Sequence, residues 1–157
     1  MSASSTSRRS TGSAPRILSV NSMFAVGHNN RGHLPPGMSV SWRGTDRRMA
    51  RLAAILPHAV GPVDHHIEVD LADRRTVVSH DFREASAWFL EPRYHNVLAR
   101  PLIRVAVAGR SADEVIGLFA HEMAHYRQWS RTGRTSERGV AVLGRSIAKA
   151  IRREMRR

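Results

Sequence analysis

The residues with the clearest chemical meaning form the pentapeptide His121-Glu122-Met123-Ala124-His125, which has the pattern H-E-x-x-H. On an α-helix, two histidines four residues apart project from the same face and can bind one zinc ion through their imidazole nitrogens. Glu122 lies at the same edge of such a helix, where its carboxylate can accept a proton from a zinc-activated water. These residue types at this spacing predict the hydrolysis of an amide bond.

The pentapeptide 121–125, called the box below, must lie on a helix to act in this way. The flanking sequence contains the signals for such a helix. Ser111 and Glu114 have the spacing of a capping box at a helix start. Gly133 supplies a stop signal, and no proline interrupts residues 111–133. Apolar residues recur at helical spacing between these ends: Val115, Ile116, Phe119, Ala120, Met123 and Ala124. We therefore predict one amphipathic helix here. The alternative is a buried helix whose two histidines are ordinary core residues.

A catalytic zinc usually has three protein ligands, so a third ligand has to be found. The longer pattern H-E-x-x-H-x-x-G-x-x-H is absent, because Gln128 and Arg131 stand at its glycine and third histidine positions. Downstream of the box, only Glu137 and Glu154 carry side chains suited to the metal. We favour Glu137, because it opens a second amphipathic segment whose first helical turn would come back toward the box. The upstream histidines stay open as alternatives: His65, His66, His80 and His95.

The box followed by a downstream glutamate resembles the zinc metallopeptidases of the gluzincin type, within the zincin superfamily. The resemblance covers residues 100–157. It implies a minimal zincin-like domain that cleaves peptide bonds, with one Zn²⁺ per chain held by His121, His125 and Glu137. It also implies that Glu122 is the general base. The segment 121–129 is similar to small SprT-like proteins as well, but those use a third histidine downstream, which this chain lacks.

The rest of the chain predicts one small domain that follows a basic tail. Residues 1–44 are rich in serine and arginine and are predicted to be disordered, and residues 45–157 are predicted to form the zincin-like domain. The expected fold is α+β, with a small, mostly antiparallel sheet packed on the box helix and a second helix at the C-terminus. We expect a first helix over 45–56, capped by Thr45 and closed by Pro57. A strand over 63–71 and its hairpin partner over 76–79 should follow, and then a strand over 102–107. The segment 82–90 is ambiguous, with a short helix as one option.

Several residues near the box carry further expectations. The strand over 102–107 is expected to be either a sheet edge that binds an extended substrate peptide or a plain sheet strand. Tyr126 and Trp129 are expected to pack in the core or at its rim. Stabilising the transition state needs a hydrogen-bond donor, which Tyr94, His95 or an arginine could supply. The spacing does not select among them.

The composition limits the chemistry and suggests partners. The chain has no cysteine, which excludes a cysteine nucleophile and a cysteine-ligated zinc. Its net charge of +12 is concentrated at the ends: residues 1–45 have five arginines and no acid, and residues 127–157 have ten basic residues against two glutamates. Basic ends attract nucleic acid. However, 24 arginines against one lysine also indicate a compositional bias, which inflates such charge.

Two alternatives to a simple peptidase follow from that charge. One is a basic nucleic-acid-binding protein whose box is vestigial or structural. The other is a peptidase that acts on nucleic-acid-bound proteins. No stretch of the sequence approaches the ~20 apolar residues of a membrane span, so we expect no membrane partner and a cytoplasmic location.

Overall fold

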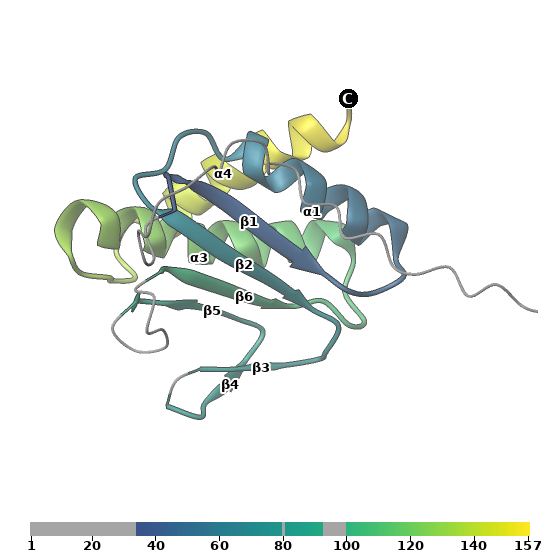
Figure 1. Ribbon diagram of the computed structural model, residues 1–157, viewed down its shortest axis with the longest axis horizontal. Helices are drawn as coiled ribbons and strands as arrows, with labels where there is room; N and C mark the ends of the chain where they lie inside the picture. The colour runs from purple at the N-terminus through teal and green to yellow at the C-terminus, as the bar shows by residue number, and fades with distance from the viewer. Residues whose placement is uncertain (1–33, 80, 93–99) are drawn as a thin grey trace, which may run out of the picture. The chain divides into compact units, whose positions relative to one another are not determined.

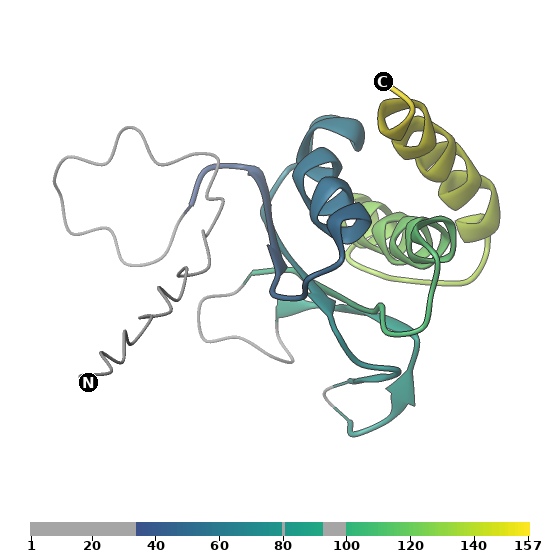
Figure 2. The same cartoon turned by 90° about the vertical axis from the view of Figure 1, so that its right-hand side faces the viewer.

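The computed structural model describes residues 34–79, 81–92 and 100–157. Within them, a four-stranded sheet carries the helices α1, α3 and α4 on one face (Figures 1 and 2). The domain is therefore α+β, as predicted. Most of the predicted tail, residues 1–33, lies outside the described residues, as do His80, Tyr94 and His95.

The sheet is mixed, so the prediction of a mostly antiparallel sheet was wrong in strand direction. Its strands, in spatial order, are β1 (Gly37–Trp42), β2 (His66–Ala72), β6 (Leu102–Ala106) and β5 (Ala87–Leu90). β2 runs parallel to both β1 and β6, and only β5 is antiparallel to its neighbour. The cause is β1, a strand that the sequence analysis placed in the tail. Because β1 lies beside β2, the helix between them becomes the crossover that a parallel pair requires.

That crossover helix, α1 (Arg47–Ala59), differs from the prediction at both ends. Asp46, not Thr45, is its N-cap, and the Asp46 carboxylate accepts hydrogen bonds from the backbone N–H groups of Arg48 and Met49. Pro57 lies inside the helix instead of closing it. A proline removes one N–H donor from the helical ladder, here the bond to the Ala53 carbonyl, and the helix ends two residues later.

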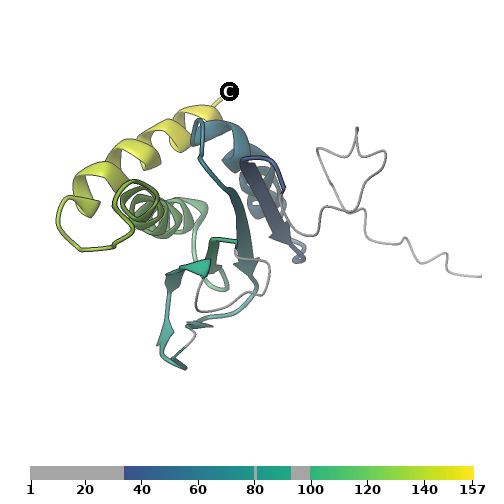
Figure 3. The same ribbon diagram turned by 60° about the vertical axis from the view of Figure 1, so that its left-hand side comes forward.

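The hydrophobic core lies between the sheet and the helices. Alternate side chains of the central strands face inward and are buried, as Ile67, Val69 and Leu71 show on β2. Two layers of helix cover them. α1 and α3 (Ala112–Thr132) lie against the sheet, and α4 (Val140–Met155) packs across both (Figure 3). This arrangement places the box helix directly beneath β5 and β6.

A small hairpin replaces two of the predicted elements. β3 (Val77–Val78) was expected to pair with the strand before it, but it pairs with β4 (Glu84–Ala85) in a separate two-stranded sheet. The segment 82–90, for which a short helix was one option, forms β4 and β5 instead. The hairpin projects from the end of the domain opposite α4 (Figure 3). The predicted strand over 102–107 is confirmed as β6.

Candidate metal centre

The box lies on α3, and the predicted helix signals are confirmed there. The Ser111 hydroxyl accepts a hydrogen bond from the Glu114 backbone N–H at 3.2 Å, and the Glu114 carboxylate accepts one from the Ser111 N–H at 2.7 Å. At the other end, Gly133 adopts φ +69°, the left-handed conformation that glycine favours, and donates to the Trp129 carbonyl. Both ends being fixed, the helix presents His121 and His125 one turn apart on a half-buried face.

The structure brings His121, His125 and Glu137 together. Nε2 of His121 lies 3.2 Å from Nε2 of His125. The two carboxylate oxygens of Glu137 lie 3.2 Å from Nε2 of His125 and 3.7 Å from Nε2 of His121. Two nitrogens each bound to a tetrahedral zinc at 2.0–2.1 Å are about 3.3 Å apart. The three donors are therefore spaced as such a site requires, and their chemistry, two imidazoles and a carboxylate, suits zinc.

Among the described residues, this is the only group of three or more potential ligand side chains that comes together. The upstream alternatives do not join it. His66 interacts instead with the Ser39 hydroxyl at 2.8 Å and with the Pro35 carbonyl. Nδ1 of His65 lies 3.2 Å from the Tyr126 hydroxyl. His80 and His95 lie outside the described residues.

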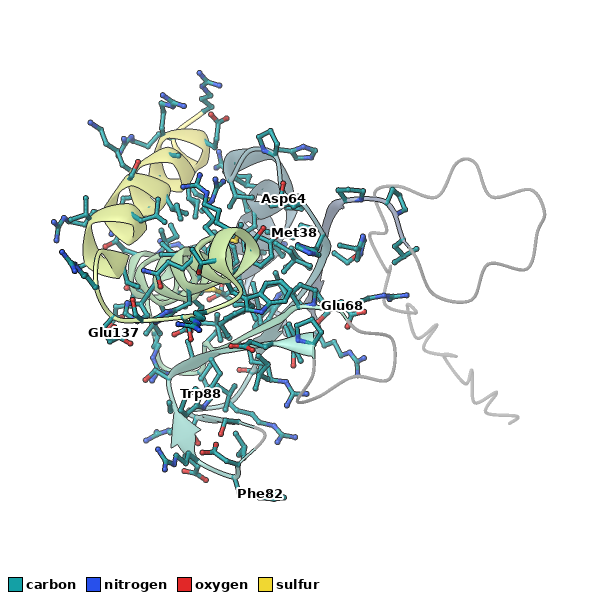
Figure 4. All side chains as sticks on the ribbon, turned by 90° about the vertical axis from the view of Figure 1, so that its left-hand side faces the viewer. Met38, Asp64, Glu68, Phe82, Trp88 and Glu137 are labelled. Carbon is teal, nitrogen blue, oxygen red and sulfur yellow. The ribbon has the colours of Figure 1, made fainter. Side chains whose placement is uncertain are left out.

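We expected Glu137 in the first turn of the second helix, but it lies before that helix. α4 begins at Val140, and its N-cap is Gly139, which adopts φ +80° and supplies no side-chain cap. Glu137 is carried by the loop between α3 and α4 (Figure 4), and 79% of its side chain is exposed. The loop has to return from the end of α3 to the face that bears the histidines. α4 begins only after this return, three residues beyond Glu137.

Glu122 is bound to the edge of the sheet. Its Oε2 accepts a hydrogen bond of 2.8 Å from the backbone N–H of Phe89 on β5. Burial raises the pKa of Glu122 to about 7, the Phe89 hydrogen bond opposes that rise, and the nearby Glu137 carboxylate adds to it. A carboxyl group with a pKa near neutrality can both accept and return a proton at that pH, which is what a general base and acid must do.

His125 is held in the form that binds metals. Burial lowers its pKa, the Glu137 carboxylate opposes this effect, and His121 adds to it. The ring is therefore neutral at neutral pH, with a lone pair free for a metal. Its second nitrogen, Nδ1, is buried and has no hydrogen-bond partner among the described residues. Metal-binding histidines usually donate this N–H to a carbonyl or carboxylate, and the described residues do not supply one.

An aromatic cluster joins the end of the box helix to β5. Tyr126 is 1% exposed, in agreement with the expected packing role, and its hydroxyl accepts hydrogen bonds from the backbone N–H groups of Asp64 and His65. Trp129 is half-buried between the rings of His65, at 5.0 Å, and Phe89, at 6.0 Å. The ring contacts of Phe89 with Tyr126 and Trp129 pack β5 against the second half of α3.

The edge of the sheet nearest the box is β5, not the strand over 102–107. That strand, β6, is paired on both sides, so of its two expected roles the plain sheet strand is confirmed and the substrate edge is wrong. Among the described residues, no strand pairs with the other side of β5, which is the last strand of the sheet. The Ser86 carbonyl, just before β5, accepts a hydrogen bond from Ala106, so the backbone groups of Ala87 and Phe89 face the opposite way, toward the open edge. Nothing in the sequence indicated Phe89, because its backbone N–H, and not its side chain, binds the Glu122 carboxylate.

Searches against models of protein families, curated proteins and solved structures gave no match. No helix among the described residues is long and apolar enough to cross a membrane.

Proposed function

We propose that this protein is a zinc-dependent peptidase. Three donor atoms at the spacing of a tetrahedral zinc site, on His121, His125 and Glu137, support this function most strongly. Glu122 adds a carboxylate with a pKa near 7 on the same helix. A bound zinc ion would supply a Lewis acid that activates water and polarises the scissile carbonyl.

The proton transfers would fall to Glu122. Its carboxylate would accept a proton from the attacking water and later deliver it to the nitrogen of the leaving amine. Burial favours the protonated form, and the Phe89 N–H favours the charged form, so the two are balanced near neutral pH. The same hydrogen bond keeps the carboxylate at the rim of β5.

The open edge of β5 supports an extended peptide as the substrate. A chain running antiparallel to β5 would pair with the outward-facing N–H and C=O groups of Ala87 and with the C=O group of Phe89, whose N–H is already bound to Glu122. Such pairing uses backbone atoms only and would bring a peptide bond of any sequence beside Glu122. Specificity would then come from neighbouring side chains, including the aromatic rings of Phe89 and Trp129.

The test compares Glu122→Gln with the wild type in two measurements. Elemental analysis should find about one zinc per chain in both proteins, because Glu122 is not a ligand. Cleavage of a quenched-fluorescence peptide library should fall on the order of 10²–10⁴-fold in the variant. Glu154→Gln is the matched control, since Glu154 pairs with Arg157 far from the box, and it should cleave normally. Undiminished cleavage by Glu122→Gln would overturn the mechanism, and a wild type without zinc would overturn the function.

Nucleic-acid contact stays a prediction from charge alone. Part of the C-terminal positive charge is engaged within the domain, because Arg152 pairs with Asp113 and Arg157 with Glu154. DNA binding that falls steeply with salt and ignores chelators would favour the nucleic-acid-binding alternative. Both that behaviour and zinc-dependent cleavage together would favour a peptidase that acts on nucleic-acid-bound proteins.

A further inference from the structure

The third ligand of the candidate metal centre lies on a loop that needs a separate means of support. Glycines in the left-handed conformation stand at both ends of this loop, Gly133 with φ +69° and Gly139 with φ +80°. Glu137 lies between them with a largely exposed side chain, so packing does little to hold it. Ordering a loop costs backbone entropy, and a ligand on a loose loop binds its metal more weakly.

One side chain of the box helix holds this loop on both sides of Glu137. The amide oxygen of Gln128 accepts a hydrogen bond of 3.0 Å from the backbone N–H of Ser136. The amide nitrogen of the same side chain donates one of 2.7 Å to the backbone carbonyl of Arg138. Glutamine suits this task, because its tip carries a donor and an acceptor side by side. The residues before and after Glu137 are thus tied to the same point.

The position of Gln128 on α3 links this tether to the two histidines. Gln128 follows His125 by three residues, so the two side chains lie on neighbouring turns of one face. A single helix therefore carries two of the proposed ligands and the anchor of the third. Thr132 fixes the start of the loop through contacts with Arg134, but its hydroxyl does not reach the residues that flank Glu137.

We propose that Gln128 is a positioning residue that holds Glu137 at coordinating distance from the two histidines. This inference rests on the proposed metal site. Gln128 itself binds no metal in this arrangement, since its amide is occupied by the backbone of the loop. Gln128 orders the loop in the metal-free protein, so that binding the ion loses less conformational entropy at the third ligand.

The test uses Gln128→Met, which keeps the length of the side chain and removes both hydrogen bonds. Zinc affinity, measured by competition with a chromophoric chelator, should fall by roughly 10- to 100-fold, the usual cost of losing a residue that orients a ligand. The cobalt-substituted protein should lose visible absorption intensity as the ligand set becomes less tetrahedral. Arg131→Met is the matched control. Its exposed side chain lies in the same turn and makes no hydrogen bond or ion pair with the described residues, so both readings should stay at the wild-type value.

Amide hydrogen exchange in the zinc-free protein separates this inference from the proposed function. The Ser136 N–H should exchange roughly five- to tenfold faster in Gln128→Met, because it loses its acceptor. Equal zinc affinity and equal Ser136 exchange in variant and wild type would overturn the tether. Faster exchange with unchanged zinc affinity would overturn the positioning role. If the wild type bound no zinc, the proposed function and the positioning role of Gln128 would both be overturned. Faster Ser136 exchange in the variant would then show only that the hydrogen bonds from Gln128 to the loop exist.

Discussion

The backbone N–H of Phe89 and the carboxylate of Glu122 are joined by a hydrogen bond of 2.8 Å that connects the edge strand to the box helix. Phe89 belongs to the last strand of the sheet, and Glu122 lies between the two histidines on α3. The same contact therefore sets the distance between the strand that would receive a peptide and the group that would move its protons. Burial around this contact raises the pKa of Glu122 to about 7.

That raised pKa predicts a pH-dependent gain in stability for Glu122→Gln in the zinc-free protein. The ordinary pKa is 4.5, so the folded state binds the proton more tightly than the unfolded state does. The stabilisation that this provides is complete below pH 4.5 and is lost as the pH rises to about 7. Glutamine stays neutral and can still accept from Phe89. At pH 8 the variant should exceed the wild type in free energy of unfolding by roughly 1–3 kcal/mol.

Urea titrations with a chelator present, at pH 4.5 and pH 8, measure this difference. The two proteins should unfold at similar urea concentrations at the lower pH. A gap of the same size at both pH values would mean that the Glu122 carboxyl is not perturbed by its surroundings.

Tyr126→Phe should destabilise the domain without removing the metal site. The Tyr126 hydroxyl accepts hydrogen bonds from two backbone N–H groups, those of Asp64 and His65, each at 3.2 Å. Phenylalanine keeps the ring packing and leaves both donors without an acceptor, which costs about 1–3 kcal/mol. Chemical denaturation measures this loss, and elemental analysis should still find the wild-type zinc content. Unchanged stability would show that water satisfies these N–H groups.

The box helix and its histidine pair could be predicted because the signals for them are local. The capping residues Ser111 and Glu114, the apolar spacing and Gly133 all lie within one continuous segment, and each acts on its own neighbours. The approach of Glu137 to the histidines was anticipated for the same reason, since a short return after Gly133 leaves the chain few routes. The position of Glu137 on a loop was not predicted, because Gly139, the N-cap of α4, has no side chain that would mark a helix start in the sequence.

The features that escaped prediction depend on contacts between distant parts of the chain. β1 was hidden within a basic, serine-rich stretch, and without it the parallel pairing of β2 could not be foreseen. Gln128 appeared only as a departure from a longer motif. Its tether to Ser136 and Arg138 exists because the loop comes back over that one turn of α3. The Phe89 N–H likewise acquires its role from the sheet edge on which it lies.

The first turn of α3 and the last turn of α4 are joined by an ion pair, and this contact should give acid-sensitive stability. Arg152 of α4 donates to both carboxylate oxygens of Asp113 on α3, at 2.5 and 3.0 Å. The hydrogen bonding lowers the pKa of Asp113 below its ordinary 3.8, so the stabilisation is present above that pH and is lost as the pH falls through the lowered value. The Asp113 side chain is 69% exposed and water screens the ion pair, so Asp113→Asn should lower the free energy of unfolding by only about 0.2–1 kcal/mol at pH 7.

A double-mutant cycle with Arg152→Met isolates this ion pair from the favourable placement of Asp113 in the first turn of α3. The coupling energy should shrink when the cycle is repeated in acid, below the lowered pKa of Asp113, and when salt is raised. A coupling energy that does not change with pH would contradict the assignment.

The crossing of α3 and α4 at Gly144 gives a last prediction, which separates the packing of the helices from their chemistry. A Cβ atom added at Gly144 would lie 3.4 Å from the Ala120 carbonyl oxygen and 3.6 Å from Cα of His121. Alanine therefore fits at ordinary contact distance and gains helix propensity, so Gly144→Ala should match or exceed wild-type stability by up to about 1 kcal/mol. A leucine side chain at position 144 would not fit in this space. Gly144→Leu should lower the free energy of unfolding by about 1–3 kcal/mol and push α4 away from the helix that carries His121.

Because the Glu137 loop leads directly into α4, that displacement should also weaken zinc binding, whereas Gly144→Ala should leave zinc binding unchanged. Ala141→Leu is the matched control, since it adds the same side chain to an exposed position of α4 and should alter neither property. Thermal unfolding and chelator competition on the three variants measure both effects. A Gly144→Leu protein that is destabilised but binds zinc as tightly as the wild type would show that the loop absorbs the shift of α4. The geometry of the centre would then depend on the loop's own hydrogen bonds and not on how closely the two helices pack.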